Sequence, residues 1–137
     1  MPHRILSHTA DTGVEARSPD LLALVVDLAT GMFESMASAP AGVTVDRTIE
    51  VEASGTNRAD LVVEILSDLL YVSDVDDVFL CDFAATSADG DGVKVTAGTI
   101  PFAEVEVHGP PVKAVTYHDL TVEETPGGWY GRVYFDV

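Results

Sequence analysis

The C-terminal residues carry oxygen atoms that could bind a metal ion. Apolar and polar residues alternate at the end of the chain, which predicts a strand with Val133, Phe135 and Val137 on one face. The chain stops while still in this strand, so a terminal carboxylate follows one residue after the carboxylate of Asp136. Ca²⁺, Mg²⁺ and Mn²⁺ prefer such oxygen ligands. From these residues alone, a cation site and an ordinary frayed end both stay open.

A second polar cluster, His8-Thr9-Ala10-Asp11-Thr12-Gly13, lies between two short predicted strands at 4–7 and 13–17. Asp and Gly favour turns, because an Asp side chain bonds to nearby backbone N–H groups and Gly accepts positive φ. The cluster is therefore either a structural turn or a ligand site that includes Asp11.

Two further segments could carry chemistry but have simpler interpretations. Asp89-Gly90-Asp91-Gly92 predicts a hairpin turn, because an EF-hand loop would need a third spaced oxygen ligand and a closing Glu. Asp74 to Asp77 predicts a solvated loop after a helix. No nucleophile elbow, P-loop or glycine-rich dinucleotide motif occurs, so no catalytic residue is predicted.

Lysine is scarce in this chain, with Lys94 and Lys113 as its only examples. Alternation across Val112 to His118 predicts a strand with Lys113 on one face and His118 on the other. A single His on a strand is either a hydrogen-bonded structural residue or part of a site, and both interpretations stay open here.

Two segments with helical periodicity would position these clusters. The first is predicted to start with Ser18 as N-cap and Pro19 as first helical residue, and it is apolar enough to be mostly buried. The second is predicted to start with Asn57 as N-cap, to carry Asp60 in its first turn and to end near Val72.

The rest of the chain predicts strands. Residues 43–53 alternate with one face toward water, and further strands are predicted at 78–86, 93–98, 103–107, 112–117, 120–124 and 129–136. Both helices come early and most strands late, so helical crossovers cannot build a fully parallel sheet. The sequence predicts one α+β domain over residues 1–137, with two helices packed on mainly antiparallel sheet.

Composition excludes several functions. The 137 residues are 47% apolar, enough for one core, and the formal net charge of −16 disfavours direct binding to nucleic acid or to an anionic membrane. The single Cys81 forms no intrachain disulfide, and the longest N-terminal apolar run, Leu21 to Leu28, is broken by Asp27 and predicts neither a signal peptide nor a membrane span. A cytoplasmic location is expected, and acids spread over every segment favour adaptation to a salty cytoplasm.

Taken together, four blocks in order resemble the archease family. They are His8 to Gly13, Asp60 to Leu66, Val112 to His118, and Gly128-Trp129 through Phe135-Asp136-Val137. The resemblance implies a small α+β protein that is a partner of the RtcB-type RNA ligase. That ligase seals RNA with a 2′,3′-cyclic or 3′-phosphate to a 5′-hydroxyl end in tRNA splicing and repair, and archeases help it acquire covalent GMP from GTP. The extreme acidity resembles a haloarchaeal member.

The resemblance also implies a site. Its divalent metal transfers to Asp11, Asp136 and the C-terminal residue Val137, with calcium favoured and magnesium or manganese compatible. His8, Lys113 and His118 fall in matching motifs and are assigned a partner-contact or supporting role. The resulting hypothesis is a non-catalytic activator that meets tRNA only through the ligase. The alternatives are a chaperone or modulator of a tRNA-modifying methyltransferase, and a metal-dependent phosphoesterase.

Overall fold

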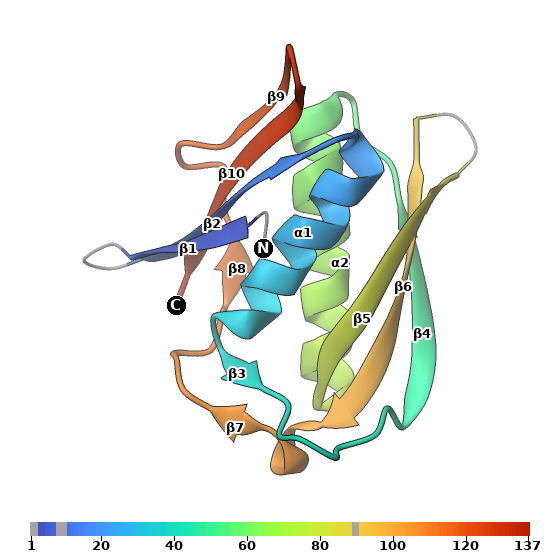
Figure 1. The fold of residues 1–137 in the computed structure, drawn as a ribbon, viewed down its shortest axis with the longest axis vertical. Coiled ribbons are helices and arrows are strands. Elements are labelled where there is room, and N and C mark those ends of the chain that lie inside the picture. The colour runs from blue at the N-terminus through green and yellow to red at the C-terminus, as the bar shows by residue number, and fades with distance from the viewer. Residues whose placement is uncertain (1–2, 8–10, 89–90) are drawn as a thin grey trace.

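Two long helices lie between two antiparallel sheets (Figure 1). The computed structural model describes residues 3–7, 11–88 and 91–137. The predicted α+β class, with two helices on antiparallel sheet, is confirmed. No helix in these described ranges is long and apolar enough to cross a membrane.

The first sheet has the strand order β1-β2-β10-β8, and β9 also pairs with β10. Its strands are β1 (His3–Ser7), β2 (Asp11–Ser18), β8 (Ala114–Val115), β9 (Thr121–Thr125) and β10 (Gly128–Asp136). β10 pairs with β2 from Trp129↔Ser18 to Asp136↔Asp11. The β9–β10 hairpin turns at Pro126-Gly127.

The second sheet has the order β4-β6-β5. Its strands are β4 (Arg47–Ala53), β5 (Val78–Ser87) and β6 (Val93–Pro101). β5 and β6 form the predicted hairpin, although Asp89 and Gly90 lie outside the described residues. A bulge interrupts β5 between Cys81 and Ala84, where Asp82 has a φ of 52°.

The helices are α1 (Leu21–Glu34) and α2 (Arg58–Asp76). α1 packs against β2 of the first sheet and β5 of the second, so it lies at the centre of the molecule. It is mostly buried, as its narrow polar stripe predicts. α2 packs against β4, β5, β8 and β9. The core contains side chains from both helices and both sheets, among them Leu28, Leu66, Leu80, Val95 and Phe135.

Both helices differ from their predicted limits. α1 is capped by Asp20, whose Oδ1 accepts from the Ala23 N–H at 2.8 Å, because Ser18 is the last residue of β2 and is held in its ladder with Trp129. α2 starts at the predicted Asn57 cap. It continues through Asp74, Val75 and Asp76, which had been predicted as a loop, because Leu69, Leu70 and Ser73 still face the core.

Some strand predictions were also wrong in extent. Residues 43–46 precede β4, and the predicted strand at 103–107 is a 3₁₀ helix (Phe102–Glu104) followed by the short β7 (Glu106–Val107). β7 pairs with β3 (Ala37–Ser38), which was not predicted. Only Ala114 and Val115 of the predicted strand 112–117 pair as a strand. The alternation of apolar and polar residues did not show that these segments pair with a neighbouring strand over only two residues each.

Candidate functional site

The ends of β2 and β10 bring two of the predicted ligands together. Asp136 of β10 is the direct partner of Asp11 of β2 in the antiparallel ladder, although the two residues are far apart in the sequence. Asp136 is exposed, and its carboxylate makes no hydrogen bond or ion pair with the residues that the structure describes. Of Asp11 the structure describes the main chain. His8, Thr9 and Ala10 lie outside the described residues, so the predicted turn there remains a prediction.

Apolar packing holds the end of β10 in place. Val133 and Phe135 are completely buried, and Val137 packs against the same core as a partly buried residue. The alternation predicted for this segment is therefore present, with Asp136 on the opposite, exposed face. Packing of Phe135 and Val137, the residues on either side of Asp136, sets its position. No contact of the Asp136 side chain itself does so.

The segment after Pro111 runs beside this end of β10. The Lys113 N–H donates to the Asp136 carbonyl at 2.8 Å, and the Thr116 N–H donates to the Tyr134 carbonyl at 3.1 Å. The hydroxyl of Thr116 donates to the same Tyr134 carbonyl at 3.0 Å. These three bonds fix the backbone of Lys113 next to Asp136. The Lys113 residue also lines a shallow hollow with Tyr71 and Asp74 of α2.

His118 is exposed and lies outside the strands. Its Nε2 is 3.3 Å from Asp119 Oδ2, and its ring centre is 6.0 Å from that of Tyr134. The side chain is therefore neither a buried structural residue nor part of a strand. Its ring contact with Tyr134 places it on the polar side of β10, beside the position that precedes Phe135 and Asp136.

The structure explains why residue 13 is a glycine, which the sequence alone did not show. A Cβ atom at Gly13 would lie 2.7 Å from Cδ1 and 2.8 Å from Cε1 of Tyr134, its ladder partner. The aromatic ring therefore lies flat across the glycine. This contact positions Tyr134 two residues before Asp136, and a side chain at Gly13 would displace it.

Sequence reasoning also missed a contact between Tyr117 and Asp60. The Tyr117 hydroxyl donates to Asp60 Oδ1 at 2.7 Å, and Oδ2 of Asp60 accepts from the Thr56 N–H at 3.0 Å. These bonds stabilise the carboxylate and hold the pKa of Asp60 below its usual range, with the Tyr117 bond as the main cause. The contact ties the segment after Lys113 to the first turn of α2. Nothing in either local pattern indicates it.

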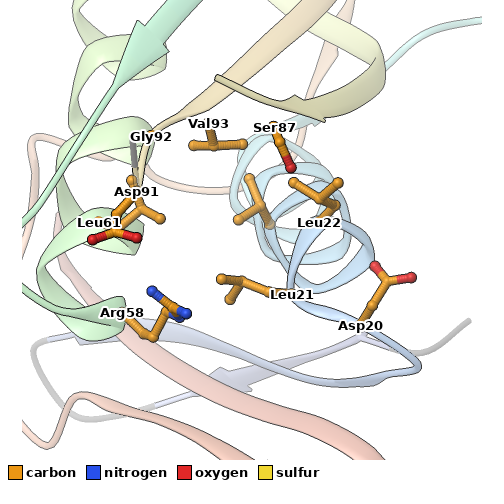
Figure 2. A pocket seen from close by; sticks show the side chains of 10 residues that line it. Asp20, Leu21, Leu22, Arg58, Leu61, Ser87, Asp91, Gly92 and Val93 are labelled. Carbon is orange, nitrogen blue, oxygen red and sulfur yellow. The ribbon is translucent and has the colours of Figure 1, made fainter. Parts of the chain in front are cut away.

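Elsewhere, a hollow of about 440 Å³ lies between the N-terminal ends of the two helices and the β5–β6 hairpin (Figure 2). Leu21, Leu22, Leu61 and Val93 give it apolar walls, and the Arg58 side chain reaches toward it. None of the predicted ligands lines it. Cys81 is half-buried on β5, and burial raises the pKa of its thiol, which makes it a poor nucleophile.

The donor set at the end of β10 fits a hard divalent cation. Carboxylates at directly opposed ladder positions repel each other, and a cation between them removes that cost. No group of three or more His, Cys, Asp or Glu side chains that could hold a metal ion occurs among the described residues. A site here would therefore need the Asp11 side chain and a main-chain oxygen as well as Asp136.

Comparisons with known proteins identify the family. Residues 3–137 match the model of the Archease protein family (MTH1598/TM1083). The chain is 28% identical to a protein archease of Archaeoglobus fulgidus over 141 residues, covering 100% of both chains, and 29% identical to one of Methanosarcina mazei over 140 residues, covering 98% of this chain and 95% of the other.

Two solved structures have the same fold. The solution structure of Methanobacterium thermoautotrophicum protein 1598 superposes with a TM-score of 0.81 at 26% identity, covering 99% of each chain. The crystal structure of an archease from Thermotoga maritima, described as a possible chaperone, superposes with a TM-score of 0.67 at 21% identity, covering 98% of this chain and 96% of the other. Because the family model spans all but the first two residues, this chain belongs to the archease family.

Proposed function

We propose that the protein activates an RtcB-type RNA ligase by promoting the ligase's attachment of GMP from GTP, and that it catalyses no reaction itself. The observation that carries the proposal is the pairing of Asp11 with Asp136 at the end of β10. Membership of the archease family supports it, because the blocks that resemble the family include both residues.

The proposed metal site has three donors: the carboxylates of Asp11 and Asp136 and the main-chain carboxylate of Val137. Residues opposed in an antiparallel ladder carry their side chains on the same face, a few ångströms apart. A divalent cation, with calcium favoured and magnesium or manganese compatible, would supply positive charge toward the GTP phosphates in the ligase. Val133 and Phe135 hold this end of β10 rigidly, and the Lys113 and Thr116 bonds hold its other edge.

The charge of the protein suits a partner that binds RNA. At −16, the protein repels a phosphate backbone, so contact with tRNA would go through the ligase. The same charge attracts a basic, RNA-binding enzyme over distances of about a Debye length, roughly 8 Å at physiological ionic strength. In a salty cytoplasm, to which we propose the acidic surface is adapted, this attraction is shorter in range and close contacts decide the affinity.

A single-turnover assay tests the proposal. The ligase is mixed with GTP and Mn²⁺, with and without this protein, and the covalent ligase–GMP is quantified over time. We expect wild-type protein to accelerate guanylylation and Asp136→Asn to lose most of that acceleration. Asp46→Asn is the matched control, because it removes the same charge from an exposed residue that lies away from β10.

The outcomes separate the candidate functions. Equal guanylylation with and without the protein would refute the activator function. One alternative is a chaperone or modulator of a tRNA-modifying methyltransferase, and the description of the Thermotoga maritima structure as a possible chaperone agrees with its chaperone part alone. Metal-independent activation of such a methyltransferase would support that function. Turnover of a phosphoester by the isolated protein would support the phosphoesterase.

A further inference from the structure

The solvent-facing side of α2 carries large apolar side chains that nothing in the described structure covers. Tyr71 is 69% exposed, Val75 is 62% exposed and Tyr117, which lies along the same helix, is 60% exposed. Val107 beside the C-terminal half of α2 is 67% exposed. Isolated exposed apolar residues are ordinary, but four on one side of one helix form a patch of the kind that contacts a partner.

Two hollows join Tyr71 of this patch to Val107 and to Lys113. One, of about 250 Å³, is lined by Tyr71 and Asp74 of α2 and by Lys113 and Val115. The other, of about 320 Å³, is lined by Asp74 and Val107 among others. Both hollows include Leu70 and Asp74, so they meet along the helix. We call the resulting surface the α2 face and define it by Tyr71, Asp74, Val75, Val107, Lys113 and Tyr117.

The charge of the α2 face selects the kind of partner. α2 carries five acidic residues and one basic residue, Arg58, which lies at its N-terminal end. Lys113 is the one cation of the α2 face. A second copy of this chain would bring like charges together, and a nucleic acid would be repelled. An apolar patch with an acidic rim instead complements a basic protein surface that has apolar recesses.

Two features make the α2 face ready for binding. The bond from Tyr117 to Asp60 holds one aromatic anchor in place, so little side-chain freedom is lost on contact. Tyrosines are also over-represented among the residues that dominate binding energy. In addition, the Lys113 N–H bonds to the Asp136 carbonyl at 2.8 Å. The α2 face therefore adjoins the end of β10.

We infer that the α2 face is the docking surface for a basic protein, and that this protein is the RNA ligase. The identity of the partner rests on the proposed function, whereas the position of the surface does not. Docking on the α2 face holds the ligase beside Asp136. The α2 face supplies the binding affinity, and the end of β10 supplies the contact that promotes attachment of GMP to the ligase.

Binding and activation are measured separately to test this inference. Dissociation constants for the ligase come from isothermal titration calorimetry, and guanylylation comes from single-turnover assays over a range of protein concentrations. Tyr71→Ala is expected to weaken binding at least tenfold, whereas Tyr71→Phe keeps the ring and stays within about threefold of wild type. Saturating Tyr71→Ala is expected to restore the wild-type guanylylation rate, because its defect is in docking.

Charge is tested at Asp74. Asp74→Lys is expected to weaken binding and to reduce the dependence of the dissociation constant on KCl concentration. The matched control for Tyr71→Ala is Val45→Ala, because Val45 is also an exposed apolar residue but packs against Gly98 on the second sheet. It is expected to bind like wild type. Thermal unfolding confirms that each variant folds, which the exposure of Tyr71 and Asp74 favours.

Each outcome decides the matter. If wild type binds and activates the ligase but Tyr71→Ala and Asp74→Lys bind equally well, the docking surface is wrong and the proposed function stands. If wild type neither binds nor activates the ligase, both are wrong. If sedimentation shows a dimer that Tyr71→Ala dissociates, the α2 face is an interface between copies of this chain and the inference is overturned.

Discussion

The two larger sheets of this protein contribute differently. In the second sheet, β4, β6 and β5 pair over long stretches, and one face packs against the helices. In the first sheet, β10 pairs with β2 as far as Asp136 and Asp11, while its other edge pairs with only two residues of β8 at this end. The long ladders of the second sheet build the core. The end of the first sheet leaves the carboxylate of Asp136 exposed at the end of its ladder.

Because the second sheet builds the core and the end of the first sheet carries the proposed site, stability and activity should separate by sheet. Substitutions inside the second sheet should lower the free energy of unfolding without changing activation by the molecules that remain folded. Substitutions at the end of β10 should do the opposite.

Leu80→Ala should give the largest effect. Leu80 of β5 is completely buried, and truncating a buried Leu removes apolar contacts and leaves a cavity. We expect the free energy of unfolding to fall by about 2–5 kcal/mol, measured by denaturant titration. Activation per folded molecule should not change. A selective loss of activation in the folded variant would break the separation of the two sheets.

Asp11→Ala should show the opposite pattern. Removing a proposed anionic ligand should weaken divalent-cation binding and ligase activation together by about tenfold or more, equivalent to about 1.4 kcal/mol per decade. The fold should persist, because Asp11 is the first residue of β2. Full activation by a folded Asp11→Ala protein would remove Asp11 from the site.

Thermal unfolding sharpens the same comparison. KCl screens acids over the whole surface, so it should raise the midpoint of wild type and Asp11→Ala alike. A divalent cation should raise the wild-type midpoint further by binding, and this increment should be smaller in Asp11→Ala. A midpoint that stays flat or falls between low and molar KCl would reject the proposed adaptation to salt.

Extending the chain beyond Val137 tests the third proposed ligand. An added residue converts the terminal carboxylate into a neutral amide carbonyl, so metal affinity should fall by roughly tenfold. The strand should survive, because Val133 and Phe135 stay buried. Metal titration of C-terminally and N-terminally tagged proteins makes the comparison. Equal affinities would leave Asp11 and Asp136 as the only protein ligands.

Tyr117→Phe should give the smallest effect. The Tyr117 bond lowers the pKa of Asp60, so losing it should raise that pKa toward the usual 3.8. A lowered pKa in the folded state stabilises the protein above about pH 3.8, and this stabilisation is lost as the pH falls below it. Between pH 7 and pH 3, the free energy of unfolding of the variant should therefore fall less than that of the wild type. NMR titration of Asp60 and unfolding at pH 7 and pH 3 measure both changes.

Much of the fold was predictable because its signals are local. The alternation of Val133 and Phe135 indicated β10, and Asn57 indicated the start of α2. Predictions went wrong where packing overrides a local pattern. Ser18 is a good N-cap residue but is held in β2, and the acidic residues after Val72 continue α2 because its buried face continues.

The site was harder to predict than the fold. No local pattern shows that Asp11 pairs with Asp136, because the register depends on how two distant strands meet. The two residues were assigned to one site only through resemblance to the archease family. The bond between Tyr117 and Asp60 and the contact of Gly13 with Tyr134 are likewise long-range. Such contacts carry no periodicity, so sequence reasoning did not find them.

One residue, Asp77, connects α2 to β5, and it does so in the left-handed conformation with φ 54° and ψ 51°. Its N–H closes the helix on the Ser73 carbonyl, and the Ser73 hydroxyl donates to the Val78 carbonyl at 2.6 Å. A link this short leaves no slack for a hinge. We therefore expect α2 and β5 to move together, so that a partner binding to the helix meets nearly the surface of the free protein.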